Sequence, residues 1–263
     1  MDTFSTNGYI EKNVEKMQSQ LIEEDDNQFV LVVVGRTGSS KTSLSLLIDH
    51  YLNNGDVDLD NYCLNHEDFM KAYTTKPKGK TIVYEEGRDS FDRNKHSHTE
   101  NKEARDALRQ YRKFHHTVII NFQDASDLQP ELVNKIAHGM IRTPSKGIAH
   151  FYGRQDMKSM WGTKYFKGWQ DPTFRDYFPN PENYIPEINE QYEQKAEEQL
   201  EQQGENEFEN IDLITPKEAA DIVGVSAETV RNRCDDGTLD YRTLKGSNER
   251  RIVKSSIDNM IAD

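Results

Sequence analysis

Residues 31–42 read LVVVGRTGSSKT, an apolar run followed by small loop residues and then by Lys41 and Thr42. A buried strand that leads through such a loop into a helix points backbone N–H groups at phosphate oxygens. The lysine reaches the β- and γ-phosphates of a nucleotide, and the hydroxyl holds Mg²⁺. The usual pattern G-x-x-x-x-G-K-[ST] has glycine where this chain has Ser40, but serine keeps the backbone N–H. The residues expected to bind ATP are Gly35, Arg36, Thr37, Gly38, Ser39, Ser40, Lys41 and Thr42.

Outward from this loop, short apolar strands alternate with helical patterns. We expect strands at residues 29–34, 61–64, 81–84, 117–122, 139–142 and 148–152, and helices at 41–51, 67–73 and 100–114. This alternation predicts an α/β domain whose parallel sheet is flanked by helices. We expect a polar N-terminal segment at 1–27, with a helix around 10–22, then the α/β domain at 28–186. An acidic linker at 187–210, either a helix ending at Gly204 or a disordered tether, precedes a second domain at 211–263.

Two further polar groups follow strands of the expected sheet. Glu85 and Glu86 come directly after the strand at 81–84, and Gln123 follows the strand that contains Asn121. We expect Glu85 to hold Mg²⁺ together with Thr42, and Glu86 to act as general base or to position the attacking water. Gln123 would sense the γ-phosphate or orient that water. The alternative is that the two glutamates are an exposed acidic pair at a strand end.

The order of phosphate loop, strand followed by Glu-Glu, arginine-rich helix, and strand followed by Gln-x-x-Ser resembles the additional-strand P-loop ATPases. Within them, residues 28–155 are most similar to the FtsK and HerA DNA-translocation and viral DNA-packaging ATPases. Of the A-T-Q-x-x-S element of that group, only Gln123 and Ser126 match, and Ser40 and Glu85 depart from the usual glycine and aspartate. The resemblance implies a RecA-like core that hydrolyses ATP with Mg²⁺ in a homo-oligomeric ring.

Arginines recur on the expected helix at 100–114. Arg105, Arg109 and Arg112 are four and three residues apart, so they share one helical face. In a ring ATPase, Arg105 and Arg109 on such a face can supply an arginine finger to the neighbouring subunit or contact the strand that is moved. The alternative is a solvated helix whose arginines pair with nearby glutamates and aspartates.

The C-terminal residues carry a second set of motifs. Thr215, Pro216 and Glu218 form a capping box with proline at the first helical position, and Gly224 makes a turn before a second helix. A hairpin follows. This pattern resembles the winged helix-turn-helix of the excisionase and MerR-like families, which implies DNA binding through the second helix and the wing. Candidate groove contacts are Thr229, Arg231 and Asn232, and candidate backbone contacts are Arg233, Arg242, Lys245, Arg250 and Arg251. The alternative is a module that binds protein.

Composition limits the function classes. The net charge of −13 excludes a protein that coats nucleic acid with its whole surface, so any DNA contact is local. The longest apolar run, at 29–34, is too short to span a bilayer, and two distant cysteines do not make a disulfide framework. We expect a soluble cytoplasmic protein. The leading hypothesis is a viral or plasmid-type DNA packaging or translocation ATPase. The alternatives are a nucleotide-switched DNA-binding regulator or replication initiator, and a Zot-like morphogenesis factor, which usually carries a membrane segment.

Overall fold

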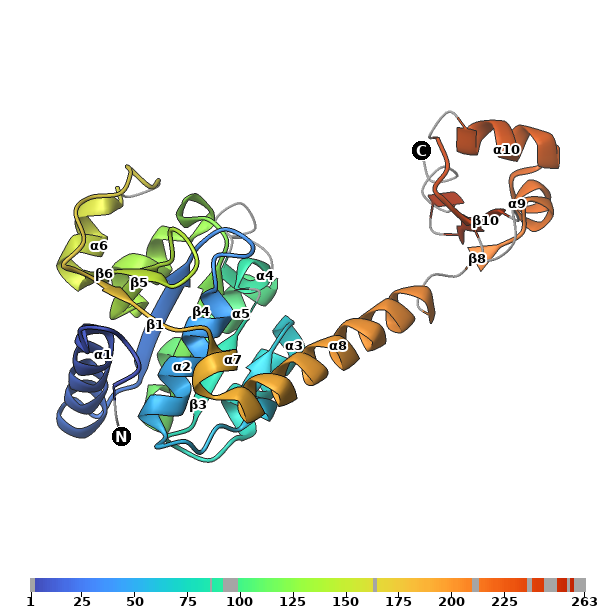
Figure 1. Cartoon of the computed structure of the whole chain (residues 1–263). Coiled ribbons are helices and arrows are strands. Elements are labelled where there is room, and N and C mark those ends of the chain that lie inside the picture. Colours follow the sequence, from blue (N-terminus) through green and yellow to red (C-terminus); the bar gives the residue numbers. More distant parts are fainter. Residues whose placement is uncertain are drawn as a thin grey trace. The chain divides into compact units, whose positions relative to one another are not determined.

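The computed structural model describes residues 3–85, 87–91, 99–162, 165–209, 213–235, 238–243, 250–254 and 256–257. The chain divides into two compact units, Met1–Gln194 and Lys195–Asp263. The first unit contains a seven-stranded sheet among its described residues, in the order β2-β3-β4-β1-β5-β6-β7 (Figure 1). The strands are β1 (Phe29–Val34), β2 (Tyr62–Cys63), β3 (Thr81–Tyr84), β4 (Thr117–Phe122), β5 (Gly139–Arg142), β6 (Ile148–Gly153) and β7 (Phe174–Tyr177).

The sheet is mostly parallel. Strands β2, β3, β4, β1 and β5 run parallel to one another, whereas β6 pairs antiparallel with both β5 and β7. The expected α/β class is therefore confirmed, and β3, β4 and β5 have the bounds that the sequence predicts. Strand β7, which the sequence does not predict, lies at the edge, where alternate side chains remain exposed.

Every residue of β1 is buried because both faces of the sheet are covered. Val30, Val32 and Val34 face a core shared with the helices α3, α5 and α6. The alternate residues of the strand face a second core, which includes α1, α2 and the start of α8. A continuous apolar run is the expected sequence of such a strand, since successive side chains point to opposite faces.

Helices and short helical turns connect the strands of the first unit. They are α1 (Tyr9–Ser19), the π-helical turn η1 (Gln20–Glu24), α2 (Lys41–Leu52), the 3-10 turn η2 (Leu59–Asn61), α3 (His66–Thr75), α4 (Arg88–Phe91), α5 (Thr99–Gln110), the 3-10 turns η4 (Arg112–Phe114) and η5 (Ala125–Asp127), the π-helical turn η6 (Leu132–Ile136), α6 (Arg154–Met160), α7 (Pro181–Tyr184) and α8 (Pro186–Glu209).

The N-terminal residues belong to the first unit and are not a separate polar segment. Phe4, Ile10 and Val14 are buried in the second core. The carboxylate of Asp176 in β7 accepts hydrogen bonds from the Ser5 hydroxyl at 2.8 Å and from the backbone N–H of Tyr9 at 2.9 Å. The chain before β1 therefore packs over one face of the sheet, in the same compact unit as the α/β domain expected from residue 28.

The expected linker also begins inside the first unit. Residues 186–209 form the helix α8, which continues past Gly204, where we expected a helix to end. Ile188 and Tyr192, four residues apart on one helical face, pack against the second core. The acidic segment is thus helical, and its first turns are anchored.

After the end of α8, the described residues of the second unit include the helices α9 and α10 and a small sheet. Helix α9 (Pro216–Val223) begins at a capping box, in which Thr215 Oγ1 accepts from the N–H of Glu218 at 3.1 Å. Gly224, with φ 74°, ends it in the left-handed region and turns the chain towards α10 (Ala227–Asp235). Strand β10 (Arg250–Val253) pairs antiparallel with β8 (Leu213–Ile214) and with β9 (Tyr241–Thr243). A core that includes Ala219, Val230 and Ile252 is buried between them.

Candidate functional site

The loop from Gly35 to Ser40 joins β1 to α2 and packs closely against the end of β5. A Cβ on Gly35 would lie 2.1 Å from Thr143 Oγ1 and 2.3 Å from Ser39 Oγ, so only glycine fits there. These two hydroxyls are hydrogen-bonded to each other at 2.8 Å. Gly38 has φ 76° with open space around it, so glycine is favoured there by the backbone angle and not by a lack of room for a side chain. Tight packing at one end of the loop and a left-handed residue within it fix the path of the backbone.

Ser40 also adopts the left-handed conformation, with φ 70° and ψ 35°. Residues with a side chain enter this region at a cost, whereas glycine does so readily. The usual glycine at this position therefore reflects the backbone angle that starts α2. The serine keeps that angle, so the loop geometry is preserved under strain.

Lys41 and Thr42 stand at the first turn of α2, next to the loop. Lys41 Nζ donates to the Arg36 carbonyl at 3.4 Å, so the side chain lies back over the loop. The N–H groups in the first turn of a helix have no acceptor within the helix and carry the positive end of its dipole. Together with the ammonium group they favour an anion at this point.

A hydrogen-bonded network joins Thr42 to the ends of β3 and β4. Thr42 Oγ1 donates to Glu85 Oε2 at 2.6 Å, and the same oxygen accepts from Asn121 Nδ2 at 2.8 Å. Asn121 Oδ1 accepts from Ser45 Oγ at 2.9 Å, which fixes the orientation of the amide. Glu85 is buried, with 9% of its surface exposed. The structure therefore brings Thr42 and Glu85 together as the sequence predicts, and adds Asn121 and Ser45 as residues that position the carboxylate.

The oxygen atoms of Thr42 and Glu85 in this network fit Mg²⁺, because this ion prefers hard oxygen ligands. It takes one or two of them from the protein and the others from nucleotide phosphates and water. Thr42 and Glu85 would hold the ion. Within the described residues, no group of three or more His, Cys, Asp or Glu side chains could hold a metal by itself. A metal at this point would thus need oxygens from a bound phosphate. Glu86, the expected general base, lies outside the described residues.

Asp49 lies two turns after Thr42 on α2 and is almost completely buried. Its Oδ2 accepts from the Tyr62 hydroxyl at 2.9 Å, and its Oδ1 accepts from Asn53 at 2.5 Å. Burial raises the pKa of Asp49 to about 6, although these hydrogen bonds act to lower it. Through its bond with Tyr62, the Asp49 carboxyl links α2 to β2.

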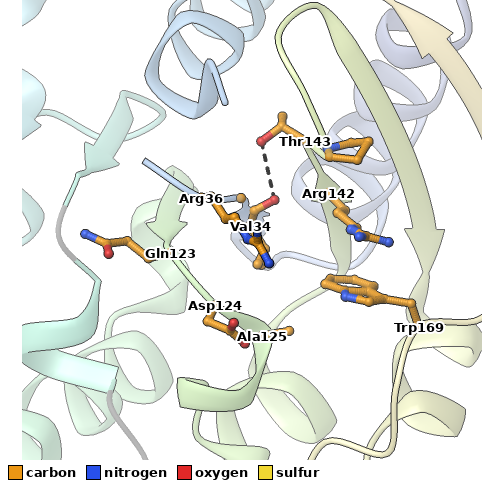
Figure 2. Close-up of a pocket in the computed structure, with 10 residues that line it drawn as sticks. Val34, Arg36, Gln123, Asp124, Ala125, Arg142, Thr143 and Trp169 are labelled. Atoms are coloured by element: carbon orange, nitrogen blue, oxygen red, sulfur yellow. Dashed lines mark hydrogen bonds between the residues drawn. The ribbon is translucent and has the colours of Figure 1, made fainter. Parts of the chain in front are cut away.

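Gln123 is exposed just after β4 and lines a pocket of about 340 Å³. The pocket borders the phosphate loop at Gly35 and Arg36 but does not include Lys41 or Thr42. Its far wall is the guanidinium of Arg142, stacked 4.5 Å from the centre of the Trp169 ring. Figure 2 shows Gln123 on the opposite side of the pocket from this pair. The structure therefore places Gln123 beside the loop, as predicted, at the edge of a polar cavity.

The arginines of α5 have partners within their own domain. Arg105 is buried, donates to Gln129 Oε1 at 3.2 Å and lies 3.6 Å from Glu131 Oε2. Arg109 pairs with Oε1 of the same glutamate, and 42% of its side chain is exposed. Arg105 thus faces the interior, which does not fit the arginine-finger role that we expected. Arg112 lies in η4 and not on the same helix.

The second unit presents part of the expected DNA-contact set. Arg231 and Asn232 on α10 are exposed, and Arg233 is half-buried. Ser226 Oγ caps α10 by accepting from the Thr229 N–H at 3.1 Å, and the Thr229 hydroxyl is hydrogen-bonded to the same oxygen at 2.9 Å. Arg250 lies over the Tyr241 ring, 4.9 Å from its centre, and Arg251 is half-buried on the same strand. Lys245 lies outside the described residues, and the structure describes only the backbone of Arg242.

Comparison with known proteins adds no assignment. No family model matches the chain, and no curated protein matches its sequence. In the part of the chain that the structure describes, no helix is both long enough and apolar enough to cross a membrane.

Proposed function

We propose that this chain binds ATP with Mg²⁺, hydrolyses it and acts on DNA, as a DNA packaging or translocation ATPase does. The observation that carries the proposal is the 2.6 Å bond between Thr42 and Glu85. It joins a hydroxyl at the start of α2, next to a lysine and an anion-binding loop, to a buried carboxylate at the end of β3. Hydroxyl and carboxylate oxygens beside a phosphate site are the set that a Mg²⁺-nucleotide requires.

The strand order supports the same proposal. Strand β4 lies between β1, which leads into the phosphate loop, and β3, which ends one residue before Glu85. The carboxyl ends of parallel strands meet at one edge, so Asn121 and Gln123 come between the loop and the acid. This sheet is compatible with the RecA-like core that the resemblance to the additional-strand P-loop ATPases implies.

Each residue has a defined task in this proposal. The loop N–H groups and Lys41 bind the β- and γ-phosphates and compensate their charge. Thr42 and Glu85 hold Mg²⁺, which supplies further stabilisation of the charge on the transferred phosphoryl group. Asn121 keeps Glu85 in place. Glu86 is assigned to orient or deprotonate the attacking water, and Gln123 to report the γ-phosphate.

The direct test is an ATPase assay on the full chain, with and without duplex DNA. We expect hydrolysis that DNA stimulates, and loss of nucleotide binding in Lys41→Ala. Lys71→Ala removes an exposed lysine from α3 and is the matched control, expected to behave like the wild type. Glu85→Gln keeps an acceptor for Thr42 but removes the charge, so it should bind nucleotide with a weakened dependence on Mg²⁺. Equal hydrolysis by wild type and Lys41→Ala would refute the proposal.

DNA binding is assigned to the second unit. Its two short helices joined at Gly224, followed by the paired strands β9 and β10, are compatible with a winged helix-turn-helix. Exposed Arg231 and Asn232 would contact base edges, and the wing arginines would contact phosphates. In mobility-shift assays on the full chain, Arg231→Ala should reduce preference among duplex sequences. Arg175→Ala, an exposed arginine of the first unit, is the control. No shift of any duplex at low salt, where phosphate contacts are strongest, would argue for a protein-binding module.

The ATPase assay also separates the proposed motor from its alternative, a nucleotide-switched DNA-binding regulator or replication initiator. The motor requires turnover, and ring assembly should appear as a nucleotide-dependent increase in mass in solution. Nucleotide binding that changes DNA affinity without hydrolysis would favour the switch.

A further inference from the structure

A second cavity lies at the amino edge of the sheet, away from the phosphate loop. Gln28 directly precedes β1 and His138 directly precedes β5, and these two strands are parallel neighbours. Both residues line a cavity of about 180 Å³, together with residues from the end of α5, from η4 and from η6. Strand β1 has six residues, which at ~3.3 Å each separate the cavity from the phosphate loop by about 20 Å. The cavity is therefore distinct from the proposed nucleotide site.

Two polar side chains of the cavity wall are held in place by hydrogen bonds. Gln28 is buried, and its Nε2 donates to the Leu108 carbonyl at 2.5 Å while its Oε1 accepts from the Tyr73 hydroxyl. His138 Nδ1 accepts from the backbone N–H of Val30 at 3.1 Å. Burial lowers the pKa of His138 to about 4, so the ring is neutral and carries its proton on Nε2. His138 thus contributes an N–H donor without a charge.

Three cations from neighbouring elements line the same cavity. They are Arg109 at the end of α5, Arg112 in η4 and Lys135 in η6. The carboxylate of Glu131 pairs with Arg109 and, at 3.0 Å, with Lys135, and it also lies 3.6 Å from the buried Arg105. Within the described residues, Arg112 is exposed and forms no ion pair. One carboxylate therefore faces several cations, and positive charge is in excess.

The surroundings of the cavity add to this excess. Arg154 donates to the Lys135 carbonyl at 3.4 Å, and after burial its charge is the next cause that lowers the pKa of His138. Asp26, two residues before β1 begins to approach the cavity at residue 28, is paired with His115 at 2.7 Å. In a chain whose net charge is −13, this cavity is a local positive region.

The chemistry of the cavity fits a phosphate group. Arginine forks and a lysine ammonium form charge-assisted hydrogen bonds with phosphate oxygens, and a neutral imidazole N–H adds a further donor. A carboxylate has fewer oxygens and less charge, and a single arginine can satisfy it. At ~30 Å³ for each water-sized group, about 180 Å³ has room for a phosphate group with bound water, but not for a whole nucleoside triphosphate.

We propose that the cavity between Gln28, His138 and the cations of α5, η4 and η6 binds a phosphate group, supplied either by free phosphate or by the backbone of DNA. The inference goes beyond the proposed function, because it needs no nucleotide at the phosphate loop.

The test measures binding of inorganic phosphate to the full chain by isothermal titration calorimetry, at constant ionic strength and without Mg²⁺. All proteins carry Lys41→Ala, which removes the lysine of the phosphate loop. Arg112→Gln and Lys135→Gln each remove one cation that lines the cavity. Lys113→Gln is the matched control, because it removes the same charge at an exposed position next to Arg112 that does not line the cavity. A second arm measures the Kd for a DNA duplex at several salt concentrations.

The Lys41→Ala protein should bind phosphate, and Arg112→Gln and Lys135→Gln should bind it about tenfold more weakly, as the loss of a hydrogen bond to a charged group predicts. Lys113→Gln should bind like the Lys41→Ala protein. If DNA supplies the phosphate, the two cavity variants should also weaken duplex binding and reduce the slope of log Kd against log salt by about one. If free phosphate is the ligand, their duplex binding should equal that of the control. The proposal is overturned if neither ligand distinguishes the cavity variants from Lys113→Gln.

Discussion

Replacing Ser40 by glycine should stabilise the first unit, because the backbone at this position is left-handed, with φ 70° and ψ 35°. A residue with a side chain pays about 1–2 kcal/mol to enter this region. Glycine enters it readily but loses about 0.5–1 kcal/mol more chain entropy on folding. The difference predicts that Ser40→Gly raises the free energy of unfolding by about 0.5–1 kcal/mol, or Tm by about 2–3 °C for a domain of this size.

The assay is urea unfolding without nucleotide, followed by tryptophan fluorescence. Both tryptophans, Trp161 and Trp169, lie in the first unit, so the signal reports that unit. Ser40→Ala keeps the Cβ and removes a hydroxyl that makes no capping bond, and it should unfold like the wild type. Gly38→Ala should destabilise by a similar amount, since its φ is 76° in open space. Stabilisation by Ser40→Ala equal to that by Ser40→Gly would refute the backbone explanation.

Three further predictions concern buried charges. Because burial raises the pKa of Asp49 from 3.8 to about 6, its folding contribution is present below pH 3.8 and is lost as pH rises through 6. Relative to the wild type, the unfolding free energy of Asp49→Asn should therefore rise by about 2.4 kcal/mol between pH 4 and pH 7. Asp176→Asn weakens the acceptor that ties down the N-terminal residues and should destabilise by about 2–3 kcal/mol in urea unfolding, with faster proteolysis before β1. Arg105→Met breaks a buried pair with Glu131 and should cost about 3 kcal/mol, whereas Arg109→Met, at a half-exposed pair, should cost less than about 1 kcal/mol by the same measurement; equal effects would contradict the assignment.

The parallel strands of the sheet could be predicted from sequence because both of their faces are buried. Strand β4 is apolar almost throughout, and its bounds follow from the run itself. Strand β7 reads Phe-Arg-Asp-Tyr and lies at the sheet edge, so no apolar run marks it. Asp176 within it reads as a surface charge, and only the tertiary structure shows that it binds the N-terminal backbone.

The candidate site also has parts that could be predicted from sequence and parts that could not. The meeting of Thr42 and Glu85 could be predicted, because both follow strands of one parallel sheet at their carboxyl ends. The bond from Asn121 to Glu85 depends on β4 lying between β1 and β3, which motif order alone does not establish. The arginine spacing on α5 correctly indicated a shared face for Arg105 and Arg109, but Arg105 has buried neighbours, and spacing does not show which side is inward.

Tyr192 shows why composition is a poor guide to the structure of the acidic segment at residues 187–210. Glutamate and glutamine dominate residues 187–210, and a solvated tether is the natural interpretation. Two apolar side chains four residues apart suffice to anchor a helix turn, because each buries a large area against an existing core. One of those two, Tyr192, meets the Tyr62 ring edge-on, with 5.6 Å between centroids. The segment that looks most like a spacer therefore begins inside the first unit, held by side chains that its overall composition hides.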